Sequence, residues 1–149
     1  MRAVVQRVSY GRVLVDGEIT GRIGHGLMVL LGVGKEDNEA DADYIADKII
    51  KLRIFPDREG KMNLSLLDVN GEILIVSQFT LFGDCRKGRR PSYSESADLL
   101  RAEELYRYAI GIFEKSGLTV ETGVFQAMMD VEICNKGPVT LLLDSKKQF

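Results

Sequence analysis

Two short runs of hydrophobic residues dominate the hydropathy pattern of the chain. Residues 73–76 (Ile-Leu-Ile-Val) are all apolar, and residues 27–33 are apolar up to the glycine at 32. Short continuous runs rich in β-branched residues are typical of strands that are buried on both faces. Residues 2–8 alternate instead, and the Asp16-Gly17 pair between two β-prone runs indicates a tight hairpin. The pattern therefore predicts a sheet with at least two fully buried strands.

Two longer segments have apolar residues at spacings of three and four, which is the period of an amphipathic helix. The first begins after Asn38, a good N-cap, and we expect the carboxylates of its first turns, including Asp41, on the solvated side. The second covers residues 96–115 and is followed by Gly117, a plausible stop signal. We expect two main helices packed outside the sheet.

Three further strands are predicted in the last third, at residues 118–122, 130–134 and 139–143. Pro138 lies between the last two, and a proline has no N–H to donate to a strand ladder. We therefore expect a bulge or a turn at residues 135–138, with carbonyl groups left unpaired, although an ordinary hairpin corner would look the same in sequence. The Gly137–Pro138 bond can also be cis at modest cost.

The hydrophobic run at 73–76 continues into a block of polar side chains, Ser77, Gln78 and Thr80, interrupted by Phe79. Buried polar groups cost free energy unless they are hydrogen-bonded, so a polar block following a core strand indicates a pocket or an interface. The alternative is a strand end whose side chains bond the neighbouring backbone. If the strand continued, Gln78 and Thr80 would share one face and Ser77 and Phe79 the other.

Composition and charge narrow the choice of function. With 149 residues, 45% hydrophobic and 28% charged, the chain fits a single domain, residues 1–149, of an ordinary globular protein. No apolar run is long enough to span a bilayer and the N-terminus does not resemble a signal peptide, so we expect a cytoplasmic protein with free thiols at Cys85 and Cys134. A net charge of −2 argues against a protein that coats nucleic acid through bulk positive charge. The one histidine, His25, is expected in a surface turn, and a single histidine leaves too few ligands for a transition-metal site.

The only concentration of positive charge directly follows the polar block. Residues 83–92 contain four cations, Arg86, Lys87, Arg89 and Arg90. Such a loop could bind phosphates, because each arginine presents a rigid fork of donors and each contact releases counterions. Cys85 beside these cations is a weaker candidate, as a nucleophilic thiol. A loop with an apolar tip, Phe125, Ala127 and Met129, is expected to fill the core, with a substrate pocket as the alternative.

Two motifs, taken together with their flanks, resemble the D-aminoacyl-tRNA deacylase family. The first is Ser-Gln-Phe-Thr-Leu at 77–81, and the second is Asn-Lys-Gly-Pro-Val-Thr at 135–140, where many members have an acidic residue at the Lys136 position. The likeness extends over nearly the whole chain, including residues 1–8, 52–69 and 86–92. It implies an α+β fold with a mixed, barrel-like sheet and two helices packed outside.

The resemblance also implies an activity and a set of site residues. The activity is hydrolysis of the ester bond of D-aminoacyl-tRNA to free tRNA and D-amino acid, extending to glycyl-tRNA mischarged on tRNA(Ala), with no cofactor. The implied site lies at a homodimer interface, where a cis Gly137–Pro138 bond of one subunit, supported by Arg7 and Asn135, faces the polar block of the other and excludes L-amino acids. The implied partner is aminoacyl-tRNA, with no DNA and no membrane. The implied catalytic residues are Ser77, Gln78, Phe79 and Thr80.

The chemistry of the substrate fits a site without histidine. An aminoacyl ester is already activated, so the protein mainly has to hold it, stabilise the developing oxyanion and admit water. We expect the backbone N–H groups of Phe79 and Thr80 to bind the ester carbonyl, with water assisted by the ribose 2′-OH ranked above the Thr80 hydroxyl as nucleophile. Two alternatives from other classes are a nucleic-acid-binding module without catalysis and a thiol hydrolase that uses Cys85.

Overall fold

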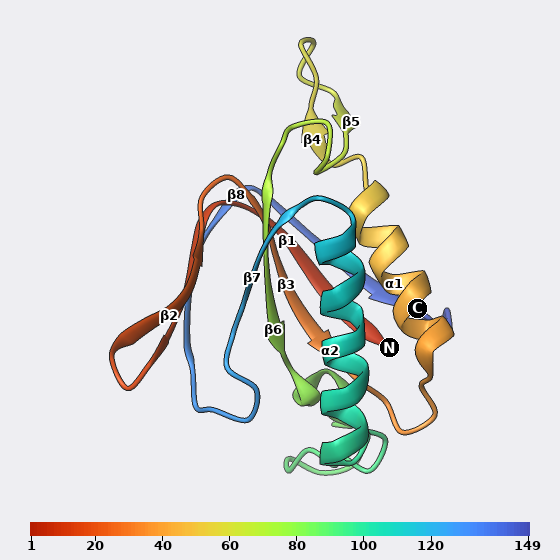
Figure 1. Ribbon diagram of the computed structural model, residues 1–149. Helices are drawn as coiled ribbons and strands as arrows, with labels where there is room; N and C mark the ends of the chain where they lie inside the picture. Colours follow the sequence, from red (N-terminus) through yellow and green to blue (C-terminus); the bar gives the residue numbers. More distant parts are fainter.

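A six-stranded mixed sheet with two helices packed on one side makes up the fold (Figure 1). The computed structural model describes residues 1–149. Along the chain the elements are β1 (Arg2–Val15), β2 (Glu18–Ile23), β3 (Gly26–Gly32), α1 (Glu39–Lys51), β4 (Phe55–Pro56), β5 (Met62–Leu64), β6 (Glu72–Ser77), the 3₁₀ helix η1 (Phe79–Phe82), α2 (Leu99–Lys115), β7 (Thr119–Thr122) and β8 (Asp130–Asp144). The predicted α+β class and the two main helices are confirmed.

The long strand β1 connects the sheet. Its first half pairs antiparallel with β3, its second half pairs antiparallel with β2, and β8 pairs with it over most of its length. Strands β3, β6 and β7 continue the sheet in parallel pairings. The sheet curls until β2 approaches β7, where a Cβ atom on Gly21 would lie 2.5 Å from the Thr122 carbonyl oxygen. The missing side chain at Gly21 thus allows the barrel to come close to closing.

The central strands are buried on both faces, as the hydrophobic runs predict. In β6, Ile73 and Ile75 belong to the main core cluster between the sheet and the helices. Leu74 and Val76 point the other way, into a smaller cluster enclosed by the curled sheet. Alternation with period two explains this division. Strand β6 therefore contributes side chains to both clusters, one from each face.

The helices begin and end where local signals place them. The Asn38 side chain caps α1 by accepting a hydrogen bond from Ala40 N–H, and the Asp41 side chain completes a capping box. Helix α2 begins after Asp98 and is followed by Gly117, whose φ of 83° fits a helix stop. The buried hydroxyl of Tyr106 on α2 donates to the Ile75 carbonyl at 2.8 Å, which ties this helix to β6.

Three expectations from the sequence are wrong in detail. The first strand does not end near residue 8 but runs to Val15, so β3 pairs with its first half and β2 with its second half. Residues 130–134 and 139–143 belong to one strand, β8, whose register shifts where the bulge was expected. Asp41 is buried, because its carboxylate pairs with Lys146 at 2.8 Å in addition to capping α1.

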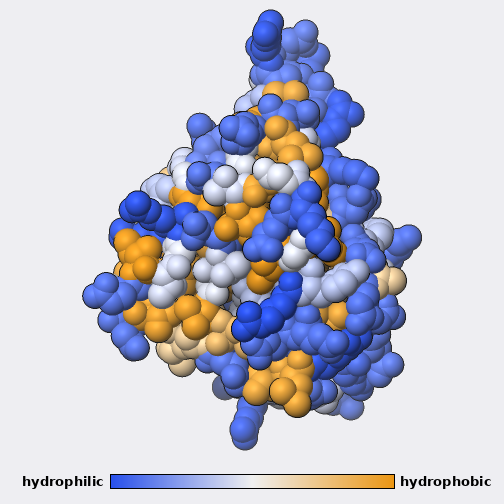
Figure 2. Space-filling model, in the orientation of Figure 1, coloured by the Kyte–Doolittle hydropathy of each residue, from blue (hydrophilic) through white to orange (hydrophobic).

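Two peripheral features complete the architecture. The short hairpin β4–β5 projects from one end of the molecule, and Figure 2 shows that its tip is hydrophilic while apolar surface lies beneath it. The two termini lie close together, where Ser145 N–H donates to the Met1 carbonyl at 2.9 Å. Neither α1 nor α2 is long and apolar enough to cross a membrane.

Candidate functional site

The polar block lies at a turn. Strand β6 ends at Ser77, and residues 79–82 form η1, so the expectation of a continued strand with alternating faces is wrong. Gln78 N–H donates to the Leu31 carbonyl at 2.8 Å, which fixes the turn to the end of β3. The close approach depends on Gly32, where a Cβ atom would lie 2.8 Å from the Gln78 carbonyl oxygen. The missing side chain at Gly32 therefore lets the turn pack against the end of β3.

A pocket of about 660 Å³ opens beside this turn. Its walls are mostly apolar, and they come from the ends of β3 and β6, the start of α2 and the loop before β8. The lining includes three of the predicted catalytic residues, Ser77, Gln78 and Phe79, and the three predicted pocket residues, Phe125, Ala127 and Met129. Residues 125–129 therefore line a cavity as well as packing on the core, which is the alternative that the sequence left open.

Hydrogen-bonding groups gather at the mouth of this pocket. The Gln78 side-chain amide donates to the Thr80 hydroxyl. The turns of η1 begin with Leu81 N–H donating to the Gln78 carbonyl, so the preceding N–H groups of Phe79 and Thr80 have no acceptor within the helix. Thr80 itself is exposed and is not part of the pocket wall.

The second motif lies in β8, where its register against β1 shifts to form a bulge. The Gly137–Pro138 bond is cis. The Asn135 side chain closes the bulge: its Oδ1 accepts from Val139 N–H at 2.9 Å, and its Nδ2 donates to the Thr140 hydroxyl at 2.8 Å. Residues 136–138 between these anchors are exposed. The corner is thus held at its base and presents its tip to solvent.

Arg7 supports the same corner from β1. Its Nε donates to the Lys136 carbonyl at 3.0 Å and its Nη1 to the Ile54 carbonyl at 2.6 Å. The resemblance implied that this arginine holds the carbonyls of Gly137 and Pro138, but its acceptors are different ones. The φ of 131° at Gly137 favours glycine at this position, and a Cβ atom there would lie 2.8 Å from Arg7 Nη2.

The two motifs are far apart within one chain. The Gln78 turn is bonded to Leu31, which pairs with Ala3 on β1, whereas Asn135 pairs with Val8. At a rise of about 3.4 Å per residue, the five steps along β1 from Ala3 to Val8 correspond to roughly 17 Å. The corner therefore does not reach the pocket of its own chain.

The basic loop lies next to the turn, and its four cations are not equivalent. Arg86 binds Asp84 through two hydrogen bonds, of 2.9 and 2.8 Å. These bonds, together with one from the Arg86 backbone N–H, lower the pKa of Asp84 to about 2. Lys87, Arg89 and Arg90 are exposed and have no ion-pair partner.

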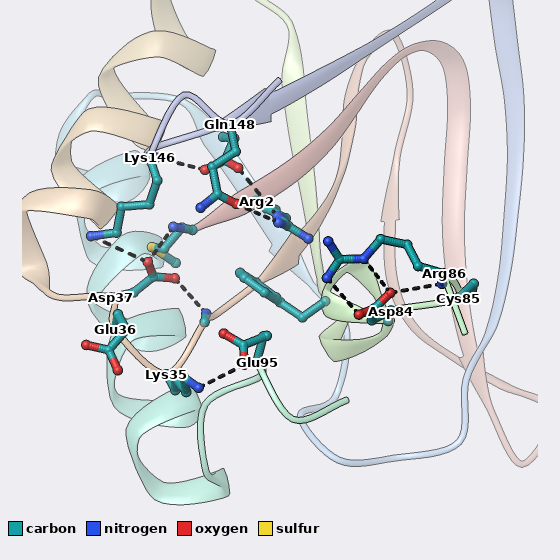
Figure 3. Close-up of a pocket in the computed structure, with 15 residues that line it drawn as sticks. Arg2, Lys35, Glu36, Asp37, Asp84, Cys85, Arg86, Glu95, Lys146 and Gln148 are labelled. Atoms are coloured by element: carbon teal, nitrogen blue, oxygen red, sulfur yellow. Dashed lines mark hydrogen bonds and ion pairs between the residues drawn. The ribbon is translucent and has the colours of Figure 1, made fainter. Parts of the chain in front are cut away.

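A second, more polar cavity of about 900 Å³ lies on the other side of Arg86 (Figure 3). Its charged groups are largely paired with one another: Lys35 with Glu95 at 2.8 Å, and Arg86 with Asp84. Arg2 lies over the Phe82 ring, 4.6 Å from its centroid. Of the predicted site residues only Arg86 lines this cavity, together with the weaker candidate Cys85, so the smaller, apolar pocket is the better candidate site.

Comparison with known proteins shows which family the chain belongs to. The model of a family described as D-Tyr-tRNA(Tyr) deacylase matches residues 4–144. The chain belongs to this deacylase family. A relative from Fervidobacterium nodosum, named D-aminoacyl-tRNA deacylase, is 64% identical over the full length of both chains. A relative of the same name from Thermosipho africanus is 63% identical, also over the full length of both.

Two solved structures share the deacylase fold. One, described as c-Myc DNA Unwinding Element Binding Protein, is 40% identical with a TM-score of 0.91, covering 97% of this chain and 98% of that one. The other, described as a probable eukaryotic D-amino acid tRNA deacylase, has a TM-score of 0.80 at 19% identity, covering 95% of this chain and 97% of that one. The second likeness is one of fold alone.

The remaining candidates lie where the sequence suggested. His25 is exposed and its ring contacts Phe55 edge-on, with centroids 5.2 Å apart. Cys85 and Cys134 are free and exposed. The sequence did not point to Tyr93, which also lines the apolar pocket. The available signal was its position immediately after the basic loop, next in sequence to Ser92.

Proposed function

We propose that this protein hydrolyses the ester bond of D-aminoacyl-tRNA, releasing free tRNA and the D-amino acid. Membership of the deacylase family and full-length relatives that carry this name support the reaction. The observation that carries the assignment to a site is the turn at Gln78, because it places polar groups at the mouth of an apolar pocket of about 660 Å³. Pockets of this kind hold small ligands through apolar walls and a few oriented polar groups.

The turn supplies what ester hydrolysis needs most. The N–H groups of Phe79 and Thr80, which have no acceptor within η1, are suited to stabilise the oxyanion that develops on the ester carbonyl. Gln78 orients the substrate from the same side. The nucleophile is water assisted by the ribose 2′-OH of the tRNA. Lys87, Arg89 and Arg90 contact the phosphates of the acceptor end.

The complete site requires two copies of the chain. The separation of roughly 17 Å along β1 prevents the corner from reaching its own pocket, while exposure of residues 136–138 leaves the tip available to a second copy. In the resulting homodimer, the main-chain oxygens of Gly137 and Pro138 occupy the space that an L side chain would need. Rejection is then steric, and glycyl-tRNA, which has no side chain to collide, is also hydrolysed.

Release of the amino acid from matched D- and L-tyrosyl-tRNA tests the function. We expect rapid hydrolysis of the D-ester and little above the spontaneous rate for the L-ester. Equal rates for the two would remove the chiral filter, and the absence of D-ester hydrolysis by folded protein would remove the function. Alkylation of a Cys134→Ser variant tests the rival thiol mechanism, because Cys134 next to Asn135 is exposed as well as Cys85. Loss of activity on modification of Cys85 would support a thiol hydrolase, whereas the proposed mechanism predicts that activity is retained.

The role of the Thr80 side chain has its own test. Because the backbone rather than the hydroxyl binds the oxyanion, Thr80→Ala should retain most of its kcat. The loss of the hydrogen bond from Gln78 should raise KM by a few-fold at most. Loss of turnover by three orders of magnitude or more, with substrate binding intact, would instead identify the hydroxyl as the nucleophile.

A further inference from the structure

We propose that Tyr93, together with the ring of Phe79, forms a stacking platform for an unpaired nucleobase in the single-stranded 3′ end of the substrate. This inference rests on the proposed function and assigns a role to a residue outside both sequence motifs. The two rings meet edge to face, with centroids 5.0 Å apart and planes at 67°. Both line the apolar pocket, and both are exposed, Phe79 at 56% and Tyr93 at 40%.

Tyr93 is held in place before any ligand arrives. Its ring packs on the backbone of Gly83, where a Cβ atom would lie 3.1 Å from the Tyr93 ring. Its carbonyl accepts a hydrogen bond from Ser96 N–H at 3.0 Å. A ring that is fixed on one side and open to solvent on the other loses little entropy when a flat ligand stacks on it.

The positive charges are arranged around the same point. Asp84 and Ser92 pair through two backbone hydrogen bonds, of 2.7 and 3.0 Å, and close the neck of the basic loop. Tyr93 is the next residue after this neck, so the loop that carries the unpaired cations Lys87 and Arg89 begins beside the platform. An aromatic surface beside unpaired cations is the arrangement by which proteins bind single-stranded nucleic acids, with stacking on the bases and ion pairing to the phosphates.

The apolar pocket beside the platform indicates the direction in which the bound RNA runs. If the amino acid and its ester occupy the pocket, the RNA leaves through the mouth, past Phe79 and Tyr93, towards the basic loop. The platform therefore takes a base near the 3′ end, and the loop takes the phosphates that follow. Stacking does not depend on base identity, which suits an enzyme that acts on the common end of many tRNAs.

Binding of a short single-stranded oligoribonucleotide with the CCA end of tRNA, carrying 2-aminopurine in place of its terminal adenine or of the preceding base, tests the platform. Stacking should quench the fluorescence of one of the two probes with the wild-type protein and with Tyr93→Phe. Tyr93→Ala and Tyr93→Leu should bind about 5- to 150-fold more weakly, because a stacked base contributes about 1–3 kcal/mol. Tyr108→Ala, which removes an equally exposed tyrosine on α2, is the matched control and should bind like wild type.

Three results would overturn the platform. Wild-type affinity of Tyr93→Leu would show that apolar packing suffices without an aromatic face. Equal quenching by a blunt duplex of the same sequence would show that no unpaired base is bound. Unchanged affinity of Tyr93→Ala accompanied by weaker self-association would assign the ring to the subunit interface instead.

Kinetics separates this inference from the proposed function. Tyr93→Ala should raise the KM for D-tyrosyl-tRNA by a similar factor while kcat stays near wild type, because the ring does not touch the ester. If the wild-type protein hydrolyses D-tyrosyl-tRNA and Tyr93→Ala has an unchanged KM, the platform alone fails. If quenching depends on Tyr93 but no D-ester is hydrolysed, the proposed function fails and the platform stands.

Discussion

Replacing Asn135 by alanine probes the corner that we propose as the chiral filter. The change removes two hydrogen bonds, to Val139 N–H at 2.9 Å and to the Thr140 hydroxyl at 2.8 Å, and leaves a half-buried N–H without its acceptor. At about 1 kcal/mol net for each hydrogen bond, the expected loss is about 2 kcal/mol. For a chain of this size, that loss lowers Tm by about 4–8 °C.

The same free energy sets an upper limit on the functional effect. If all of it serves to hold the corner in place, a loss of about 2 kcal/mol reduces discrimination between D- and L-esters by at most about 30-fold. The assay compares kcat/KM for D- and L-tyrosyl-tRNA, and thermal unfolding is followed at one fixed protein concentration because a dimer's Tm depends on concentration. We expect L-ester hydrolysis to rise while D-ester hydrolysis changes little.

One milder variant separates the two hydrogen bonds. Thr140→Val removes the hydroxyl that accepts from Asn135 Nδ2 and, at 3.4 Å, from Gln6 Nε2, and it keeps the bond from Val139 N–H to Asn135 Oδ1. This variant should show about half the loss, and combining it with Asn135→Ala should be non-additive because both changes remove the bond between Asn135 and Thr140. Wild-type Tm and wild-type discrimination in Asn135→Ala would refute the reasoning that this side chain holds the corner.

Three further predictions follow from the structure. Replacing Arg89 and Arg90 by alanine together should raise KM most at low ionic strength and flatten its dependence on salt, and a KM unchanged at every salt concentration would remove the loop from the site. Arg86 lowers the pKa of Asp84 to about 2, so the ion pair should be intact above the ordinary pKa of 3.8 and should be lost as the pH falls towards 2. An NMR titration of the Asp84 carboxyl carbon measures this pKa, and Arg86→Ala should return it to the ordinary value. Tyr106→Phe should cost about 1 kcal/mol in the free energy of unfolding, measured by denaturant titration, because the Ile75 carbonyl still accepts from Gly123 N–H, and a loss above about 3 kcal/mol would contradict this account.

Local signals in the sequence were sufficient for the secondary structure of most of the chain. The continuous run at 73–76 predicted a strand that is buried on both faces, and the Asn38 cap predicted the start of α1. Asp16-Gly17 predicted the turn between β1 and β2, where both residues have positive φ. These features depend on backbone geometry and on neighbours within a few residues, so the amino-acid order alone determines them.

Long-range contacts decided the features that the sequence did not show. The turn after Ser77 packs against the end of β3 because the missing side chain at Gly32 lets the Gln78 backbone approach. Asp41 is buried where it forms an ion pair with Lys146, a residue near the other end of the chain. The two motifs contain the residues predicted for catalysis and for the chiral filter, but only the pairing of β1 with β3 and β8 shows that the motifs are too far apart to meet within one chain. The sequence by itself determined which groups are available for chemistry, whereas packing between distant segments decided which of them share a pocket.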